Sequence, residues 1–248
     1  MSDPRPAGVL RRLAGVGRII AFCSAKGGVG KSFCAAAAGV SLARAGRAVG
    51  LLDLDLSSAA AHLFLGVPLR LPDEDRGILP LPVVEGLSLM SAAAFTRERG
   101  LALRGAEVSD AIVELLCATQ WGQKDVLLID MPPGIGEEVL DLARLVPGLE
   151  AVVVSTPSEV SVRVVARLLA VLEDIRVPVA GVLANMVRHD AASVRALAAS
   201  RGAAFAGEVP WDPGVEGALG DAEAIARLES TRAVGEALAA ILAEPRRA

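Results

Sequence analysis

Short apolar runs alternate along this chain with longer stretches in which apolar residues recur at helical spacing. Runs that stay apolar over the length of a strand are typical of strands buried on both faces of a sheet. Their alternation with helices indicates βαβ units. The pattern therefore predicts an α/β fold, namely a doubly wound, mostly parallel β-sheet with helices on both faces.

The expected elements occupy most of the chain. Strands are predicted near residues 18–24, 48–53, 87–91, 126–130, 151–155, 179–184 and 203–207. Helices are predicted at residues 32–45, 109–118, 137–145, 158–175, 191–200 and 231–243. The last helix lacks aromatic anchors and a lysine-rich polar face, which favours docking on the sheet over membrane binding. Its apolar stripe consists of Val234, Leu238, Ile241 and Leu242.

No repeat or low-complexity linker divides this series. Residues 1–248 are therefore expected to form a single domain, with residues 1–17 as an N-terminal extension. The least regular stretch is 66–86, which is rich in proline and carries the acidic cluster 73–75. Two interpretations stay open for it: a solvated excursion before an edge strand, or a lid or partner loop.

Composition narrows the class of protein. No run of eighteen apolar residues occurs and the N-terminus has no apolar signal-peptide core, so a cytoplasmic location is expected. The net charge of −4 gives no basic footprint for nucleic acid. The three cysteines are widely spaced, which supports neither a zinc ribbon nor a redox pair and predicts buried free thiols.

The chemistry of the chain is concentrated in residues 26–32, Lys-Gly-Gly-Val-Gly-Lys-Ser, which hold two of its three lysines. This run follows a predicted strand and precedes a predicted helix, the context that a phosphate-binding P-loop requires. The alternative is a glycine-rich turn with incidental lysines. The general pattern has glycine where this chain has Ala25, which is tolerable if Ala25 keeps a negative φ.

Each position of the run has an expected role. Backbone N–H groups would cradle phosphate oxygens, helped by the positive end of the following helix. Lys31 would reach the β and γ phosphates of the nucleotide, and the Ser32 hydroxyl would ligate Mg²⁺. The predicted cradle and nucleotide contacts are Gly27, Gly28, Val29, Gly30, Lys31, Ser32 and Phe33.

Carboxylates follow two predicted strands. Asp53 and Asp55 end the second strand, where open α/β sheets bind ligands. A turn after Asp53 would place Asp53 near Mg²⁺ and Asp55 near an attacking water. The alternative is a helix cap followed by surface acids.

Residues 126–130, Val-Leu-Leu-Ile-Asp, have the form of a Walker B strand, so Asp130 is a further metal candidate. The alternative for Asp130 is a simple cap. The turn that follows brings Gly134, whose N–H could sense a γ-phosphate.

The base of the nucleotide has three candidate contacts. The chain has a single asparagine, Asn185, at the end of a predicted strand, and its amide can pair with the edge of a purine. Pro210 and Asp212 could form the other wall of the base pocket. Trp211 between them is either a packing residue or a base stack.

Together these segments resemble a known family. Residues 26–32 are similar to the deviant Walker A motif of the MinD, ParA and Mrp P-loop ATPases. The resemblance implies ATP as the nucleotide, a role for Lys26 across a subunit interface, and a homodimer that encloses two nucleotides. Asp53 and Asp55 match the switch I aspartates of that family, and in this resemblance the second positions the water. Lys26, Lys31 and Asp55 are thus the expected catalytic residues.

The segments 130–134, 156–160, 185–186 and 207–210 are most similar to the Mrp/ApbC branch, whose members are implicated as iron–sulfur cluster carriers. That activity depends on a Cys-Pro-x-Cys pair shortly after the Asn-Met. Here residues 187–192 contain no cysteine, so the sequence does not support a cluster at this position. The histidines His62 and His189 are expected to be solvent-exposed or capping.

Three function classes follow. The first is a dimeric, Mg²⁺-dependent ATP-hydrolysing switch of the Mrp-like branch that acts on an unknown protein client. The second is a positioning ATPase of the MinD or ParA kind, which binds membrane or DNA when it holds ATP. The third is a small-molecule ligase or kinase on a related scaffold, which would remain a monomer.

Overall fold

A computed structural model describes residues 5–56, 58–96, 106–134 and 136–246. Its centre is one eight-stranded sheet in the order β3-β4-β2-β5-β1-β6-β7-β8. All neighbouring strands are parallel except β3 and β4, which form an antiparallel pair at one edge. The strands are β1 (Val16–Cys23), β2 (Val49–Asp53), β3 (Leu81–Val84), β4 (Leu87–Ser91), β5 (Lys124–Asp130), β6 (Leu149–Ser155), β7 (Val179–Val187) and β8 (Phe205–Pro210).

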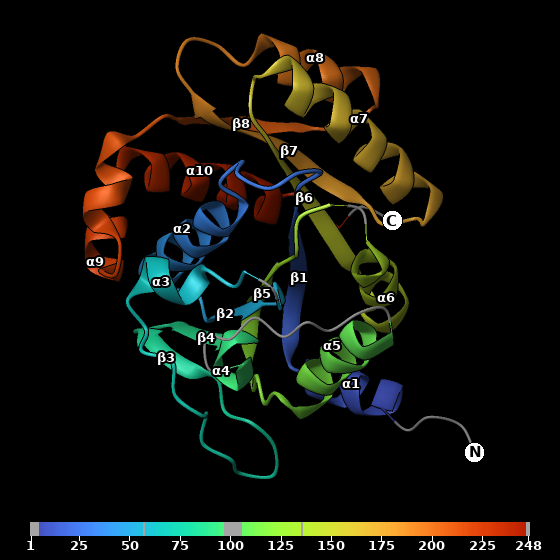
Figure 1. The fold of residues 1–248 in the computed structure, drawn as a ribbon, viewed down its shortest axis with the longest axis vertical. Helices are drawn as coiled ribbons and strands as arrows, with labels where there is room; N and C mark the ends of the chain where they lie inside the picture. Colours follow the sequence, from blue (N-terminus) through green and yellow to red (C-terminus); the bar gives the residue numbers. More distant parts are fainter. Residues whose placement is uncertain (1–4, 57, 97–105, 135, 247–248) are drawn as a thin grey trace.

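Helices cover both faces of the sheet (Figure 1). One face packs against α2 (Lys31–Arg44), α3 (Ala61–Leu65), α9 (Ala222–Ile225) and α10 (Glu229–Ala243). The other face packs against α1 (Arg5–Leu13), α5 (Ala106–Ala118), α6 (Glu137–Leu145), α7 (Glu159–Asp174) and α8 (Ala192–Ser200). The short elements α4 (Ala93–Thr96) and η1 (Pro213–Ala218) complete the described secondary structure. This is the predicted doubly wound architecture.

The two cores arise from alternation along the strands. In β1, Ile20 and Phe22 contribute to the core under α2 and α10, whereas Ile19 and Ala21 contribute to the core on the opposite face. Successive side chains of a strand point to opposite faces, so a strand that is apolar throughout supplies both cores. The apolar stripe of α10 is buried in the first of these cores, as the sequence predicts.

Two stretches differ from expectation. The irregular segment 66–86 contains the edge strand β3 instead of leading to it, and the expected edge strand β4 lies between β3 and β2. The expected extension 1–17 forms α1 and the start of β1, while its residues 1–4 lie outside the described part. Val9 and Leu13 of α1 are buried in the core with α5. Tertiary packing stabilises both β3 and α1. Their sequences are short and mix apolar with polar residues, so the pattern along the chain does not predict them.

The buried positions refine the remaining expectations. Cys23 and Cys34 are buried free thiols as predicted, and Cys117 is half-buried. His189 is exposed, but His62 is only 7% exposed, so the expected solvent exposure was wrong for His62, and its alternative role as a cap stays a prediction. His62 is buried because its helix, α3, packs against α2.

Within the ranges given above, no helix is long and apolar enough to cross a membrane.

Candidate functional site

The predicted P-loop connects β1 to α2 at the carboxyl edge of the sheet. Gly28 and Gly30 have φ values of 76° and 78°, the left-handed conformation that favours glycine. Ala25 is absent from the described non-glycine residues with positive φ, so the departure from the general pattern costs the loop nothing. Gly30 is the N-cap of the 14-residue helix α2 and brings no side-chain cap. The first N–H groups of α2 are therefore not satisfied by a cap side chain.

The space over the loop is open. A methyl group added to Gly27 or Gly28 would meet no atom of the described residues within 4 Å. Backbone N–H groups at the start of a helix, with open space in front of them, form a ready site for an anion. The loop thus has the shape and the electrostatics of a phosphate cradle.

Lys31 is buried beside the loop and forms an ion pair with Asp130 at the end of β5. The Lys31 and Asp130 side chains are only 6% and 0% exposed. Lys31 Nζ also lies 3.4 Å from Ser32 Oγ. The structure therefore brings Asp130 to two consecutive residues of the P-loop motif, Lys31 and Ser32, from which it is far apart in the sequence.

Asp53 joins this cluster from β2, because Asp53 and Asp130 are partners in the parallel register of β2 and β5. Its carboxylate accepts the N–H groups of Asp55 at 3.2 Å and Ala61 at 3.1 Å. Burial, and then the charge of Asp130, raises the pKa of Asp53 to about 7, although the backbone hydrogen bonds and Lys31 oppose the rise. Burial likewise raises the pKa of Asp130, and the ammonium of Lys31 opposes this.

Asp55 is also buried but interacts with its own loop. Its two carboxylate oxygens accept hydrogen bonds from Ser58 N at 2.8 Å and Ser58 Oγ at 2.9 Å. The carboxylate therefore orders the turn after β2 in this structure. Its expected role beside an attacking water stays a prediction.

Gly134 lies opposite the P-loop in the turn after β5, with a φ of 108°. Its N–H donates to the carbonyl of Ser24 at 2.8 Å, so the expected γ-phosphate donor is here bonded to the residue that follows β1. The same Ser24 donates from Oγ to Lys26 O at 3.1 Å. The sensor segment and the first lysine of the motif are thus linked through one serine.

The expected base contacts lie at the ends of β7 and β8. Asn185 is buried, and its Nδ2 donates to Val29 O at 2.8 Å. Pro210 pairs with Val187 across the two strands. Asp212 caps η1 through Gly214 N at 2.9 Å and also accepts from Ser230 Oγ at 2.9 Å. The structure shows Asn185 and Asp212 in contacts with the protein, which the sequence did not predict.

One exposed contact near this end was not anticipated. The guanidinium of Arg188 lies 4.4 Å from the centre of the Trp211 ring, and Trp211 is 45% exposed. Arg188 belongs to the stretch where the resemblance leads one to expect cysteines. Arginine stacked on tryptophan is a favourable cation–π pair. The two residues are far apart in the sequence, so only the pairing of β7 with β8 brings them together.

The donor set fits a magnesium ion. Ser32, Asp53 and Asp130 supply hydroxyl and carboxylate oxygens, the ligands that Mg²⁺ prefers. The second carboxylate oxygen of Asp130, Oδ2, is buried without a hydrogen-bond partner in the described structure. No cluster of three or more histidine, cysteine or acidic side chains suited to a metal occurs among the described residues. Mg²⁺ needs no such cage, because phosphate and water complete its coordination.

Comparison with known proteins identifies the family. Residues 15–244 match the ParA family profile described as NUBPL iron-transfer P-loop NTPase. The chain belongs to this family. The predicted membership in the MinD/ParA group, and its Mrp-like branch, is therefore confirmed. The matched residues of this NTPase include the glycine loop described above.

Individual relatives agree. An iron-sulfur cluster carrier protein of Pseudomonas fragi is 36% identical over 182 residues, which make up 71% of this NTPase and 63% of that protein. The chain thus spans less than two thirds of the length of this relative. A nucleotide-binding protein of Archaeoglobus fulgidus, solved with ADP, is 27% identical with a TM-score of 0.74 and covers 97% of this chain and 94% of its own.

The cell division ATPase MinD of Pyrococcus furiosus shares the fold. It has a TM-score of 0.64 at 20% identity and covers 89% of this NTPase and 96% of its own chain. These likenesses confirm the predicted fold class. Together with the family match, they support nucleotide binding by a P-loop NTPase.

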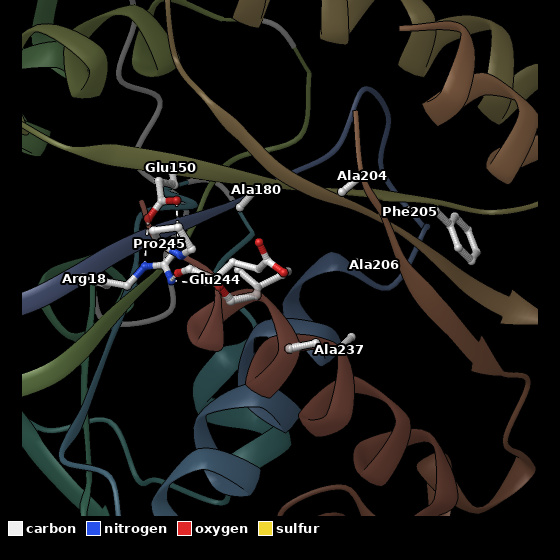
Figure 2. A pocket seen from close by; sticks show the side chains of 11 residues that line it. Arg18, Glu150, Ala180, Ala204, Phe205, Ala206, Ala237, Glu244 and Pro245 are labelled. Carbon is white, nitrogen blue, oxygen red and sulfur yellow. Dashed lines mark hydrogen bonds and ion pairs between the residues drawn. The ribbon is translucent and has the colours of Figure 1, made fainter. Parts of the chain in front are cut away.

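The amino edge of the same sheet carries a second buried ion pair (Figure 2). Arg18 of β1 donates Nε and Nη2 to the two carboxylate oxygens of Glu150, at 2.9 and 2.7 Å. Its Nη1 donates to the carbonyls of Ile241 and Glu244 at the end of α10, at 2.8 and 3.1 Å. The pair borders a cavity of about 220 Å³ lined largely by alanines. All the donors and acceptors named here are used within the protein.

Proposed function

We propose that this NTPase is a homodimeric switch that binds and hydrolyses ATP with Mg²⁺. The observation that carries the proposal is the buried pair of Lys31 and Asp130, which lies beside an open glycine cradle and leaves Asp130 Oδ2 without a hydrogen-bond partner among the described residues. A buried lysine and a buried carboxylate with spare capacity are costly unless a ligand uses them. A magnesium ion would supply the partner that Asp130 Oδ2 lacks, and the phosphates of a nucleoside triphosphate would replace Asp130 as the partner of Lys31.

The residues then have defined tasks. Lys31 leaves Asp130 and donates to phosphate oxygens, while Gly27, Gly28 and Gly30 present backbone N–H groups to them. Asp130 and Ser32 would then hold the metal, and Asp53 would support it from the neighbouring strand. Mg²⁺ would neutralise charge that develops on the phosphates. Asp55 leaves Ser58 and orients the attacking water.

Gly134 supplies the switch. Its N–H now donates to Ser24 O, and a γ-phosphate would compete for the same donor. Exchange of this hydrogen bond would move the turn after β5 relative to Ser24 and Lys26. Loss of the γ-phosphate on hydrolysis would restore the present contact. Lys26 would contact the nucleotide of the partner subunit in the ATP state and lose this contact after hydrolysis.

The base is assigned to the ends of β7 and β8. Asn185 would pair with the adenine edge, with Pro210 and Asp212 forming the opposite wall; Phe33 and Val29 complete the nucleotide contacts. In this assignment the side chain of Asp212 would keep its hydrogen bond to Gly214 N and continue to cap η1.

The client is assigned to iron–sulfur assembly. The relative from Pseudomonas fragi is named an iron-sulfur cluster carrier protein. Burial raises the pKa of Cys23 to about 12 and also raises that of Cys34, so both thiols stay protonated and are poor cluster ligands. Thiolates for a cluster would therefore come from a client protein. Purification under anaerobic conditions with iron analysis, and capture of partners in ATP and in ADP, tests this assignment.

Hydrolysis is tested by phosphate release from Mg²⁺·ATP. Lys31→Ala should lower the rate at least about 100-fold, because the group that stabilises the phosphate charge is lost. The third lysine, Lys124, begins β5 at the other edge of the sheet, so Lys124→Ala is a matched control with an unchanged rate. Equal rates for the wild type and Lys31→Ala would overturn the assignment. Light scattering with ATP and ADP tests the dimer, and a permanent monomer would favour the ligase or kinase class.

A further inference from the structure

The single asparagine of the chain is in direct contact with the P-loop. Asn185 ends the buried part of β7, is 3% exposed, and donates from Nδ2 to Val29 O at 2.8 Å. A carbonyl oxygen can only accept a hydrogen bond, so the amide must turn its NH₂ group toward the loop. We propose that Asn185 is a positioning residue that sets the conformation of the P-loop before the nucleotide arrives.

The contact controls one peptide unit of the cradle. The peptide bond between Val29 and Gly30 is planar and trans, so its C=O and N–H point in opposite directions. Asn185 holds the carbonyl of Val29 on its own side and thereby turns the N–H of Gly30 away from β7. Fixing this orientation in advance lowers the entropy that phosphate binding must otherwise overcome.

Close packing reinforces the hydrogen bond. A methyl group on Gly30 would lie 2.3 Å from Asn185 Nδ2 and 3.1 Å from Met186 Cε. Gly30 has a φ of 78°, and the backbone of Met186 has a φ of 58°, unusual for a residue with a side chain. Left-handed backbone at a non-glycine residue persists only where the surroundings impose it. The loop and the end of β7 are thus fitted to each other from both sides.

The end of β7 is itself anchored. Val187 pairs with Pro210 of β8, and its carbonyl accepts the N–H of Trp211 at 2.8 Å. Asn185 lies in an irregular step of β7, between Ala184, which pairs with Glu208, and Val187, so β8 holds the strand on both sides of Asn185. Such support from a rigid element is what a preorganised binding site requires.

This inference rests on the proposed nucleotide site but assigns Asn185 a task that does not depend on the base. A residue that only reads adenine matters for ATP and is irrelevant for inorganic tripolyphosphate. A residue that orients the P-loop matters equally for both. It also matters in the absence of any ligand.

The test compares Asn185→Ala with Gln120→Ala. Gln120 likewise donates a side-chain amide to a backbone carbonyl, that of Asp75, but lies at the amino edge of the sheet. In nucleotide-free protein, hydrogen exchange of residues 27–32 should be about tenfold faster in Asn185→Ala, because one buried hydrogen bond is lost. Exchange of residues 149–155 should stay unchanged. Gln120→Ala should match the wild type in both segments.

Calorimetric titration with Mg²⁺·ATP and with Mg²⁺·tripolyphosphate completes the test. Asn185→Ala should weaken both by a similar factor, about tenfold. The inference would be overturned if Asn185→Ala weakened ATP binding but changed neither tripolyphosphate binding nor hydrogen exchange of residues 27–32. Asn185 would then act only by binding the adenine base. If the wild type binds neither ligand, the proposed function fails, whereas the exchange experiment still decides the role of Asn185. If Asn185→Ala does not fold, Asn185→Ser takes its place in both experiments, because the serine side chain is too short to reach Val29 O.

Discussion

The two edges of the sheet each hold a buried ion pair, and the pairs differ in how fully they are satisfied. At the amino edge, Arg18 and Glu150 make two hydrogen bonds to each other, and Arg18 also caps the end of α10. At the carboxyl edge, Lys31 binds Asp130, yet Asp130 Oδ2 has no partner in the described structure.

The difference separates stability from function. A saturated buried pair has no capacity left for a ligand, and it fixes the elements that carry it. A pair with an unused oxygen can accept a further ligand, which is the exchange that the proposed function assigns to Lys31 and Asp130. The side-chain types also fit these tasks, since the arginine fork matches a carboxylate on two sides whereas the lysine ammonium acts as a single point of charge.

The largest expected effect is on the saturated pair. Arg18→Ala leaves Glu150 buried without its partner and removes the cap of α10, so the free energy of unfolding should fall by about 3–5 kcal/mol. Denaturant titration at pH 7 measures it. Arg163→Ala, which breaks a pair that is 78% exposed on both sides, is the control and should change stability by less than about 1 kcal/mol. If both variants lost a similar free energy of unfolding, the pair of Arg18 and Glu150 would contribute no more to stability than an exposed pair.

The next effect concerns pH at the carboxyl edge. The pKa of Asp53 is raised from 3.8 to about 7, so between these values the native state holds a proton that the unfolded chain has released. Stability contributed by this proton is present at low pH and is lost as the pH rises. Nucleotide-free protein should therefore lose about 2 to 3 kcal/mol between pH 5 and pH 7.5.

Asp53→Asn should flatten this dependence, as followed by denaturant titration at several pH values in EDTA. Asp110→Asn, which alters an exposed carboxylate on α5, is the matched control and should keep the wild-type slope. A slope that is the same in Asp53→Asn would show that another group titrates.

The smallest effect contrasts two glycines. A methyl group on Gly17, at the amino edge, would lie 2.5 Å from Asp125 O, whereas one on Gly27 would meet nothing within 4 Å in the part of the chain that the structure describes. Gly17→Ala should lower stability by about 1.5 kcal/mol and leave ATP binding unchanged. Gly27→Ala should keep stability within about 0.5 kcal/mol but weaken ATP binding, because its methyl group enters the space of the phosphates. Thermal unfolding measures the change in stability, and calorimetric titration measures ATP binding. A stability loss in Gly27→Ala together with weaker ATP binding in Gly17→Ala would contradict the assignment of ligand binding to the carboxyl edge.

Much of the site could be predicted because its residues follow strand ends. The P-loop, Asp53 and Asp130 each come directly after a buried run, and parallel strands bring their carboxyl ends to one edge. The partners of these residues could not be predicted. The bond from Gly134 to Ser24 and the bond from Asn185 to Val29 join segments that are far apart in the sequence.

The same limit applies to the fold. The central strands were placed to within a few residues because apolar runs and turn residues define them locally. The edge strand β3 and the helix α1 were missed, since each is short and is stabilised by packing against β4 or α5. His62 was misplaced for the same reason, as burial of a polar side chain depends on its neighbours in space.

The sequence by itself determined the layered fold, the glycine loop between β1 and α2 and the family, because each depends on residue types at short, fixed spacing. Tertiary structure alone decided which charges are saturated and which remain available. It set Arg18 against Glu150 at one edge and Lys31 against Asp130 at the other. Such pairings depend on strand order and register, which no local stretch of residues encodes.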